Sequence, residues 1–388
     1  MKTCLVSLVS DQTIPNILVA LHFRPDFLLF FSTKKMEEKV KTKAILDTLL
    51  MRGLDYTSNY HVFQVNENSL LDLQQQFIDW TAKTGDAYNY IVNLTCGNKL
   101  MSLSAYDLFK EYEATMVYVP IPRNEFLIPF PKHRPKEPTL LKERLSVEEY
   151  LTAYGFSINN KSKTIKNFQK AKERRKITEF IINRYEVLQE LFYTFIQDLR
   201  ELIKKFPKNG YAYSLGKTLK NDSEREMLKL FGFGYENGKF IKNLDKSECR
   251  FLCGGWLEEY VYIAVEEALG IKGNVMIGVE AIDRKGNKNE FDVIFTYENS
   301  LNLIECKSLD PGEGSEFKVG IIDFYYKLGA LRRNFGLTPN AYLATTSKEV
   351  YDQTGNIKPH LIERGKQFNI TLVPYDKLKN IKDFLSKT

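Results

Sequence analysis

The 388-residue sequence is poor in the residues that build disulfide frameworks and zinc sites. It has five cysteines without a Cys-x-x-Cys pair, and its four histidines are scattered. An odd number of cysteines without such spacing argues against a disulfide scaffold or a zinc ribbon. We therefore expect oxygen ligands to hold any metal ion that this protein uses.

Long apolar runs are also absent. The N-terminal run Cys4–Val9 is too short for a signal peptide, and the most apolar segment, Phe27–Phe31, is too short to span a bilayer. These lengths predict a soluble, cytoplasmic protein with no membrane partner. No Gly-x-Gly-x-x-Gly motif occurs, which disfavours a dinucleotide cofactor.

What the sequence does contain is enough apolar material for sizeable cores and a mild excess of positive charge. Hydrophobic residues make up 43% of the chain, and the net charge is +6. This composition excludes a disordered chain and is compatible with a nucleic-acid partner without demanding one.

Roughly the first 120 residues alternate apolar strand patterns with helical patterns, as expected of a parallel sheet covered on both faces. The predicted strands are Cys4–Val9, Phe27–Ser32, His61–Val65, Tyr90–Leu94 and Thr115–Val119, and the predicted helices cover 35–52, 69–83 and 98–112. The pattern predicts an α/β fold with an N-terminal doubly wound, Rossmann-like domain.

Six of the thirteen prolines fall within residues 120–138, which marks a connecting arm. A short helix at 146–154, a basic run at 161–176 and a long amphipathic helix at about 173–205 should follow it. We divide the chain into a first domain at 1–138, a helical connector at 139–206 and a second α/β domain at 207–388.

The second α/β domain should contain its own mixed sheet. Its predicted helices are Leu257–Leu269, 318–335 and 359–366, and its predicted strands are 273–282, 290–297, 301–307, 340–345 and 369–373.

The stretch NEFDVIFTYENSLNLIECKS sets charged residues inside two of these apolar strands. A tight turn centred on Glu298-Asn299 would place Asp292 opposite Glu305, with Lys307 on the same face and opposite Glu290. Facing carboxylates repel one another unless a cation lies between them, and Mg²⁺ or Mn²⁺ prefers oxygen ligands. The alternative is an ordinary ion pair between Glu290 and Lys307 on a wet sheet face.

On the metal-site interpretation, the carbonyl of Cys306 is a further ligand and Lys307 orients water or stabilises charge on a phosphate. The chemistry would be phosphodiester hydrolysis.

Asp292 followed by Glu305-Cys306-Lys307 resembles the PD-(D/E)xK nuclease motif, although Phe291 replaces its proline. The resemblance implies a further metal-site glutamate on the preceding helix, for which we favour Glu258 over Glu259. Lys327, on the following helix, is then placed to contact substrate.

Polar residues follow three of the predicted strands of the first domain, where a doubly wound sheet binds its ligands. They are Ser10, Asp11, Gln12, Thr13 and Asn16 after the first strand, Ser32 and Thr33 after the second, and Thr95, Gly97, Asn98 and Lys99 after the fourth. Gly97 would let backbone approach a phosphate, and its neighbours can donate hydrogen bonds. Several of these residue types are equally common as helix caps.

The loops SDQTIPN and T-x-G-x-K, with the nuclease motif downstream, resemble the CRISPR ancillary nucleases that join a CARF domain (CRISPR-associated Rossmann fold) to a PD-(D/E)xK domain. The resemblance implies a homodimer whose joint crevice binds a cyclic oligoadenylate, usually cyclic tetra-adenylate, through the eleven loop residues named above. It also implies a Mn²⁺- or Mg²⁺-dependent nuclease acting on single-stranded DNA or RNA, with nicking of duplex DNA as a further activity.

Two other interpretations remain open on the sequence alone. One is a ligand-responsive nucleic-acid-binding regulator with an inactive nuclease fold, which the intact Asp292–Glu305–Lys307 set disfavours. The other is a restriction or repair nuclease that cuts without an activator.

Overall fold

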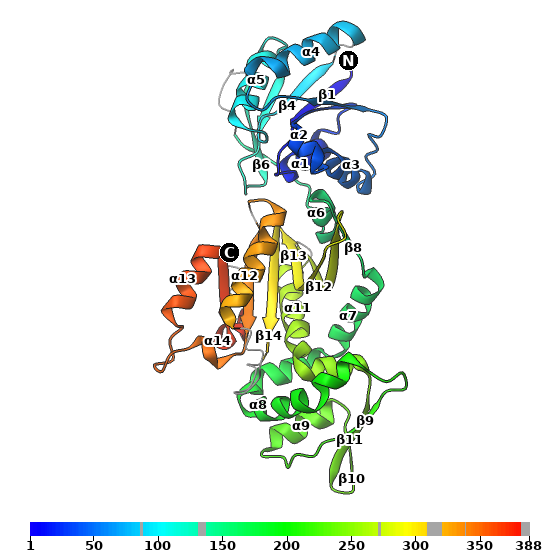
Figure 1. Ribbon diagram of the computed structural model, residues 1–388, viewed down its shortest axis with the longest axis vertical. Helices are drawn as coiled ribbons and strands as arrows, with labels where there is room; N and C mark the ends of the chain where they lie inside the picture. Colours follow the sequence, from blue (N-terminus) through cyan, green and yellow to red (C-terminus); the bar gives the residue numbers. More distant parts are fainter. Residues whose placement is uncertain (86–87, 131–136, 271–272, 309–319, 338, 382–388) are drawn as a thin grey trace.

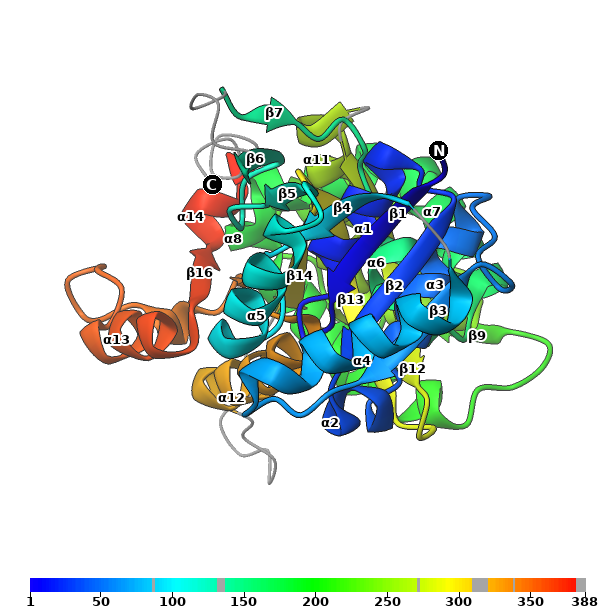
Figure 2. The same cartoon turned by 90° about the horizontal axis from the view of Figure 1, so that it is seen from above.

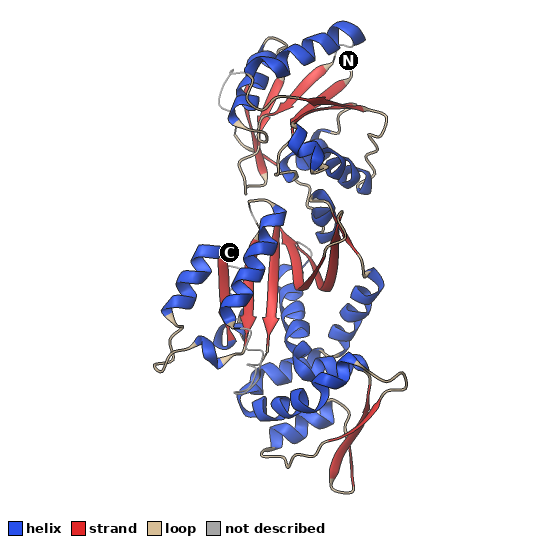
Figure 3. Ribbon diagram, viewed as in Figure 1, coloured by secondary structure: helices blue, strands red, loops and turns tan. Residues whose placement is uncertain are grey.

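The computed structural model describes residues 1–85, 88–130, 137–270, 273–308, 320–337 and 339–381 (Figure 1). The first domain lies at one end of an elongated molecule, the second sheet lies in the middle, and a mainly helical unit lies at the other end (Figures 1 and 3). Among the described residues, no helix combines the length and apolar character that a membrane crossing requires.

The sheet of the first domain has the predicted parallel strands, in the order β3-β2-β1-β4-β5, extended by antiparallel β6 and β7. Their bounds are β1 Thr3–Leu8, β2 Phe27–Ser32, β3 Tyr60–Gln64, β4 Asn89–Asn93, β5 Thr115–Tyr118, β6 Glu125–Phe130 and β7 Thr139–Leu140. The proline-rich segment thus adds strand β6 to the sheet, where only a connecting arm was expected; its residues 131–136 lie outside the described ranges.

In the described residues of this domain, five helices accompany the sheet. They are α1 Ile14–Phe23, α2 Lys34–Glu38, α3 Lys41–Met51, α4 Leu70–Thr84 and α5 Lys99–Lys110. The prediction lacked α1, and it took α2 and α3 as one helix, which Val40 breaks with a left-handed φ of 57°. Alternate residues of β1 point to opposite faces, so Val6 packs toward α4 and α5 while Leu5 packs toward α1.

The middle of the chain is mostly helical. Its elements are α6 Val147–Ala153, β8 Phe156–Ile158, α7 Lys161–Glu173, α8 Arg175–Lys204, β9 Tyr211–Ser214, α9 Asp222–Leu230, β10 Gly234–Glu236, β11 Lys239–Leu244, α10 Lys246–Arg250 and a π-helical turn at Phe251–Gly255. The predicted helices at 146–154 and 173–205 are confirmed, and the basic run forms α7. The small sheet β10-β11-β9 was not predicted.

The second sheet has the order β16-β15-β14-β13-β12-β8. Its further elements are α11 Trp256–Leu269, β12 Gly273–Asp283, β13 Lys288–Tyr297, β14 Ser300–Lys307, α12 Ile321–Arg332, β15 Asn340–Thr345, α13 Pro359–Phe368, β16 Ile370–Pro374 and α14 Tyr375–Leu378. The predicted strands and helices are confirmed, although 318–319, the expected start of α12, lie outside the described residues.

One hydrophobic core continues from the first domain into the second sheet. Leu5 and Ile17 of the first domain, Tyr150 of α6, Phe291 of β13 and Phe335 after α12 all belong to it. The first domain accordingly lies over the second sheet when the molecule is seen from above (Figure 2). A shared core predicts that movements of the two domains are mechanically linked. The predicted domain limits at 138 and 206 stay a prediction.

Candidate active site and sensor edge

The β13–β14 hairpin has the register that the sequence predicts. Its backbone pairs run from Tyr297–Ser300 at the turn to Val293–Ile304, equidistant from Glu298-Asn299. Both turn residues have positive φ, 48° and 59°, as a two-residue type I′ turn requires. The side chain of Asn299 fixes this turn, since its Oδ1 accepts from the Leu145 amide at 2.9 Å.

Asp292 and Glu305 lie just beyond the last of these backbone pairs. Asp292 Oδ2 accepts a hydrogen bond from the Cys306 amide at 2.8 Å, so the side chain takes up an N–H of the neighbouring strand. The Asp292 side chain is 14% exposed and that of Glu305 is 3% exposed. Two nearby carboxylates are thus held inside the fold by the largely buried strands β13 and β14 that carry them.

Two ammonium groups neutralise these carboxylates. Lys307 Nζ lies 2.9 Å from Glu305 Oε1 and 3.7 Å from Asp292 Oδ2. Lys327 of α12 places its Nζ 2.9 Å from both oxygens of Glu305. The structure therefore brings Lys327, which the resemblance placed near substrate, onto the same buried carboxylate.

The pKa values follow from this crowding. Burial, and next the charge of Glu305, raise the pKa of Asp292 to about 6. Burial also acts to raise the pKa of Glu305, but the ammonium groups of Lys307 and Lys327 outweigh it and lower that pKa. Burial opposes the charged form of Lys307, yet Asp292 and Glu305 raise its pKa, so Lys307 stays a cation.

Glu290 does not have the expected partner. Its nearest cation is Lys163 of α7, with Nζ 3.9 Å from Oε1, whereas Lys307 turns to Asp292 and Glu305. The alternative of an ordinary ion pair between Glu290 and Lys307 is therefore not what the structure shows, because buried carboxylates attract the ammonium more strongly than Glu290, whose side chain is 66% exposed.

Glu258 and Glu259 start α11 side by side but respond to different charges. Burial, and then the charge of Asp292, raise the pKa of Glu258 well above its usual value. Burial raises the pKa of Glu259 to about 7 against the opposing effect of Arg174, whose Nη1 lies 2.9 Å from Glu259 Oε1. Glu258 is therefore the glutamate beside the carboxylate group, and Glu259 is held by Arg174.

Lys307, which pairs with both carboxylates, lines a cavity of about 1090 Å³. Glu258, Glu290, Cys306, Lys307 and Ser308 line it from the second domain, and side chains of α7 and α8 line it from the helical unit. A substrate in this cavity would therefore contact Lys307 and Glu258 directly.

The donor chemistry around the cavity fits a divalent cation that prefers oxygen ligands. Burial and like charge disfavour ionised Glu258 and Asp292, and a cation between them would relieve both effects. In the described part of the chain, however, no three His, Cys, Asp or Glu side chains form a ready-made metal cluster. The metal ligands predicted from the sequence stay a prediction.

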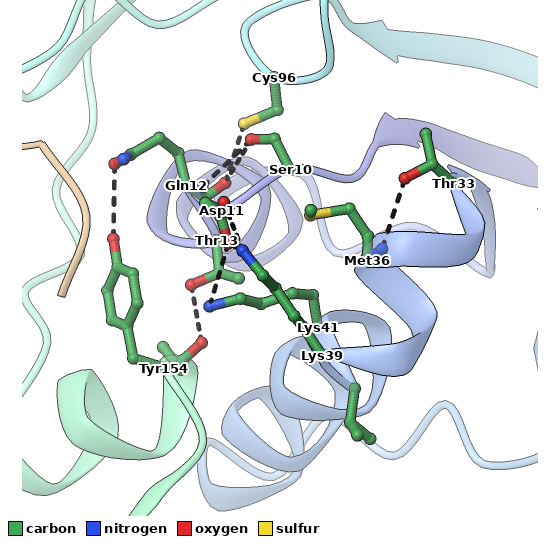
Figure 4. A network of polar contacts seen from close by, with 12 residues as sticks. Ser10, Asp11, Gln12, Thr13, Thr33, Met36, Lys39, Lys41, Cys96 and Tyr154 are labelled. Carbon is green, nitrogen blue, oxygen red and sulfur yellow. Dashed lines mark hydrogen bonds and ion pairs between the residues drawn. The ribbon is translucent and has the colours of Figure 1, made fainter. Parts of the chain in front are cut away.

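The structure also brings the predicted polar loops of the first domain together. In the order β3-β2-β1-β4-β5 the loops after β1 and β4 are neighbours, at the point where the strand order reverses. Cys96 Sγ donates to the Gln12 carbonyl at 3.1 Å, and Ser10 Oγ accepts from the Gln12 amide at 3.1 Å (Figure 4). Gly97 adopts a left-handed φ of 80°, and a Cβ there would lie 3.0 Å from Leu8 Cβ.

Several predicted loop residues serve the fold itself. The Thr13 hydroxyl is buried and donates to the Ala153 carbonyl at 2.7 Å. Asn16 and Ser32 are buried as well, and they donate to the Leu8 carbonyl and to Glu37, respectively. These hydrogen bonds fix the positions of the loops.

Of the remaining predicted loop residues, some cap helices or form local hydrogen bonds, and others are exposed or half-buried. Thr33 and Asn98 cap helices α2 and α5 through the amides of Met36 and Met101, and Thr95 Oγ1 donates to Asn93 Oδ1 at 2.6 Å. Asp11 and Lys99 are exposed and Gln12 is half-buried.

Three residues at this edge were missed by the sequence analysis. Lys39 lies 2.8 Å from Asp11, and Lys41, which is buried, lies 3.9 Å from it (Figure 4). Lys41 also lies 5.0 Å from the ring centre of Tyr154, whose hydroxyl is 3.5 Å from Gln12 Oε1. Lysines shortly after a strand end were a usable signal, whereas Tyr154 reaches this edge only through the packing of α6.

Known structures share this fold. Protein VC1899 from Vibrio cholerae has a TM-score of 0.77 at 19% identity, covering 99% of this chain and 97% of its own. Can2 from Sulfobacillus thermosulfidooxidans, solved with cyclic tetra-adenylate, has a TM-score of 0.73 at 20% identity, covering 99% and 98%. A type III CRISPR defence DNA nuclease activated by cyclic oligoadenylate has a TM-score of 0.53 at 16% identity, covering 95% and 52%. Identities this low show the fold alone.

A comparison with proteins of curated function found no match. Family models, in contrast, match both domains. Residues 4–150 match the Card1 CARF domain, and residues 245–388 match the Card1-like endonuclease domain. Both halves of the resemblance drawn from the sequence are thereby confirmed. The chain belongs to the CRISPR ancillary nucleases that join a Card1-type CARF domain to a Card1-like endonuclease domain.

Proposed function

We propose that this protein is a metal-dependent endonuclease of type III CRISPR defence that cyclic tetra-adenylate activates. It hydrolyses phosphodiester bonds in single-stranded DNA or RNA, and nicks duplex DNA as a secondary activity. The observation that carries the proposal is the buried Asp292–Glu305–Lys307 group, whose Lys307 lines a large cavity in a chain with an endonuclease domain.

Each residue of this group has a distinct task. Asp292 is oriented by the Cys306 amide, and Glu305 is oriented by two ammonium groups, so both carboxylates are fixed before substrate arrives. Lys307 is a cation that lines the cavity, where it can hold a scissile phosphate or orient the attacking water.

Asp292, Glu305, the Cys306 carbonyl and Glu258 would hold a Mn²⁺ or Mg²⁺ ion. Such an ion, when bound, lowers the pKa of water and neutralises charge on the phosphate. Burial raises the pKa of Glu258, so this residue gives up its proton most readily when a cation is near.

Activation would begin at the edge where the loops after β1 and β4 meet. In the proposed homodimer two such edges form one crevice, and a two-fold protein crevice suits a two-fold ring of phosphates. Lys99 and Asn98 are exposed there, and Lys39 and Lys41 add positive charge. Can2, which has this fold, was solved with cyclic tetra-adenylate, which supports the same choice of ligand here.

The signal has a short physical route to the nuclease group. Tyr154 contacts Gln12 and Lys41 on the sensor side, and its ring lies 6.1 Å from that of Phe335. Phe335 in turn lies 6.0 Å from the ring of Phe291, the residue before Asp292. An activator that binds one packing arrangement of this core better than another would shift the nuclease between two states.

A cleavage assay tests the proposal. Full-length protein is incubated with labelled single-stranded DNA, single-stranded RNA or an intact supercoiled circular duplex, in Mn²⁺ or Mg²⁺, with and without cyclic tetra-adenylate. We expect cleavage only with both metal and activator. Cleavage without activator would instead support a restriction or repair nuclease, and activator binding without any cleavage would support a regulator.

The variant Glu305→Ala tests whether cleavage depends on the proposed metal site. It should abolish cleavage and leave activator binding intact, because Glu305 lies in the second domain. Glu363→Ala, which removes an exposed carboxylate of α13, is the matched control and should cleave normally. Substantial cleavage by Glu305→Ala would remove that residue from the metal site.

A further inference from the structure

Helices α7 and α8 together form one wall of the cavity that contains Lys307. Lys163, Asn167 and Lys170 line it from α7. These positions are spaced i, i+4 and i+7, so they form one stripe along the helix. Asn167 fits closely against the sheet, since a Cβ at Gly278 would lie 2.5 Å from its Nδ2.

Helix α8 contributes a second stripe with the same spacing. Tyr193, Gln197 and Arg200 line the cavity, and the Tyr193 side chain is 41% exposed. An exposed aromatic ring inside a cavity is free to stack on a flat apolar partner. The two stripes thus combine cations, amides and one ring, all facing the space in front of the catalytic group.

The cations of this wall are available to a ligand. Lys163 and Lys170 have only long, exposed ion pairs, at 3.9 Å to Glu290 and 3.5 Å to Asp245. Pairs of this kind contribute little, so a phosphate can replace the carboxylate. Within the described ranges, Arg200 on α8 and Arg250 at the end of α10 have no ion pair, and both line the cavity.

We propose that the stripes of α7 and α8 bind the substrate strand and select single-stranded polynucleotide. The cations follow its phosphates, while Tyr193 stacks on an unpaired base, which a duplex does not offer. These stripes lie in residues 151–244, between the segments that the two family models match. The proposal rests on the proposed nuclease function and adds the residues that bind the substrate strand.

The binding of a labelled oligonucleotide, measured without cleavage, tests substrate binding by the α7 and α8 stripes separately from the nuclease reaction. Full-length protein with cyclic tetra-adenylate is titrated, in EDTA, against fluorescent oligo-dT, the matching RNA and a hairpin duplex, with fluorescence anisotropy as the readout. Tyr193→Ala should weaken single-strand binding about 5- to 150-fold, the effect of one lost base stack. Arg200→Ala should reduce the slope of log affinity against log salt by about 0.7, the value for one phosphate contact.

Matched controls come from the same unit of the chain but lie outside the cavity. Arg225→Ala removes an exposed cation of α9, and Tyr235→Ala removes an exposed ring of β10. Both should bind oligo-dT like the unmodified protein. In cleavage assays with metal, Tyr193→Ala and Arg200→Ala should raise KM while leaving kcat within about twofold, since neither touches the reacting group.

The results distinguish a failure of the binding proposal from a failure of the proposed nuclease function. Two results would refute the proposal that the α7 and α8 stripes bind and select single strands. One is that Tyr193→Ala and Arg200→Ala bind oligo-dT as tightly as their controls, and the other is that the duplex binds as tightly as the single strand. If the unmodified protein binds oligo-dT through these residues but never cleaves it with metal and activator, the proposed nuclease function is refuted, whereas single-strand binding by the stripes is supported.

Discussion

Replacing Phe335 with alanine should weaken the packing that joins the sensor domain to the nuclease sheet. Phe335 is fully buried, and its ring centre lies 4.9 Å from Phe156, 6.0 Å from Phe291 and 6.1 Å from Tyr154. Its carbonyl accepts from the Tyr150 hydroxyl at 3.3 Å. Phe335 therefore contacts α6 and the residue that follows it, β8 and the strand that carries Asp292.

The size of the effect follows from these contacts. Truncation of a buried Phe to Ala lowers the free energy of unfolding by about 3–5 kcal/mol. Because Phe335 also forms aromatic pairs, we expect a loss in the upper part of that range. A loss of about 4 kcal/mol lowers the melting temperature by about 8–16 °C in a domain of 150–250 residues. Phe335→Leu, which keeps most of the volume, should cost less than about 1.5 kcal/mol.

Stability alone does not test the coupling, so a matched variant is needed. Phe77→Ala removes an equally buried ring, 4.7 Å from Phe109, from the core on the far face of the sensor sheet. Both variants should melt at lower temperature. Only Phe335→Ala should also reduce the ratio of cleavage rates with and without cyclic tetra-adenylate, by at least about fivefold, the lower range of allosteric coupling.

Thermal melts followed by circular dichroism, and cleavage rates well below the lowered melting temperature, give both quantities. Equal activation ratios in Phe335→Ala and Phe77→Ala, at similar losses of stability, would refute the role of the shared core in transmitting the signal.

Three further experiments, with four substitutions, test other parts of the structure. Lys99→Ala should weaken cyclic tetra-adenylate binding at least about fivefold in calorimetry, because it removes an exposed cation at the loop after β4; unchanged binding would remove this loop from the activator site. Glu258→Gln should lower cleavage at least about 100-fold while Glu259→Gln retains most of it, and the reverse result would exchange their roles. Arg174→Ala should destabilise the fold by about 3 kcal/mol in thermal melts, since it leaves buried Glu259 without its cation; an unchanged melting temperature would contradict this.

Much of the Asp292–Glu305–Lys307 group was predictable from the sequence because it depends on short-range geometry. The spacing around Glu298-Asn299 fixes the register of the hairpin, and the register places Asp292 near Glu305. Strand alternation then puts Lys307 with them. These relations need only the two-residue period of a strand and the turn type.

Helix α1 shows where pattern reasoning fails. Its residues from Ile14 to Leu21 are all buried, so it has no polar face and no helical period in its hydrophobicity. Its environment, between the sensor sheet and the core shared with α6, is a property of the folded molecule.

The sequence by itself determined the two α/β domains, the hairpin register and the polar loops at the carboxyl ends of the sensor strands, because each follows from local periodicity. Only the tertiary structure decided that Glu290 pairs with Lys163, that Glu258 rather than Glu259 lies by the carboxylates, and that Lys327 reaches Glu305. It also brought the stripes of α7 and α8 to the cavity that Lys307 lines. Those outcomes depend on how distant helices pack on a sheet, and residue spacing along one segment carries no information about that.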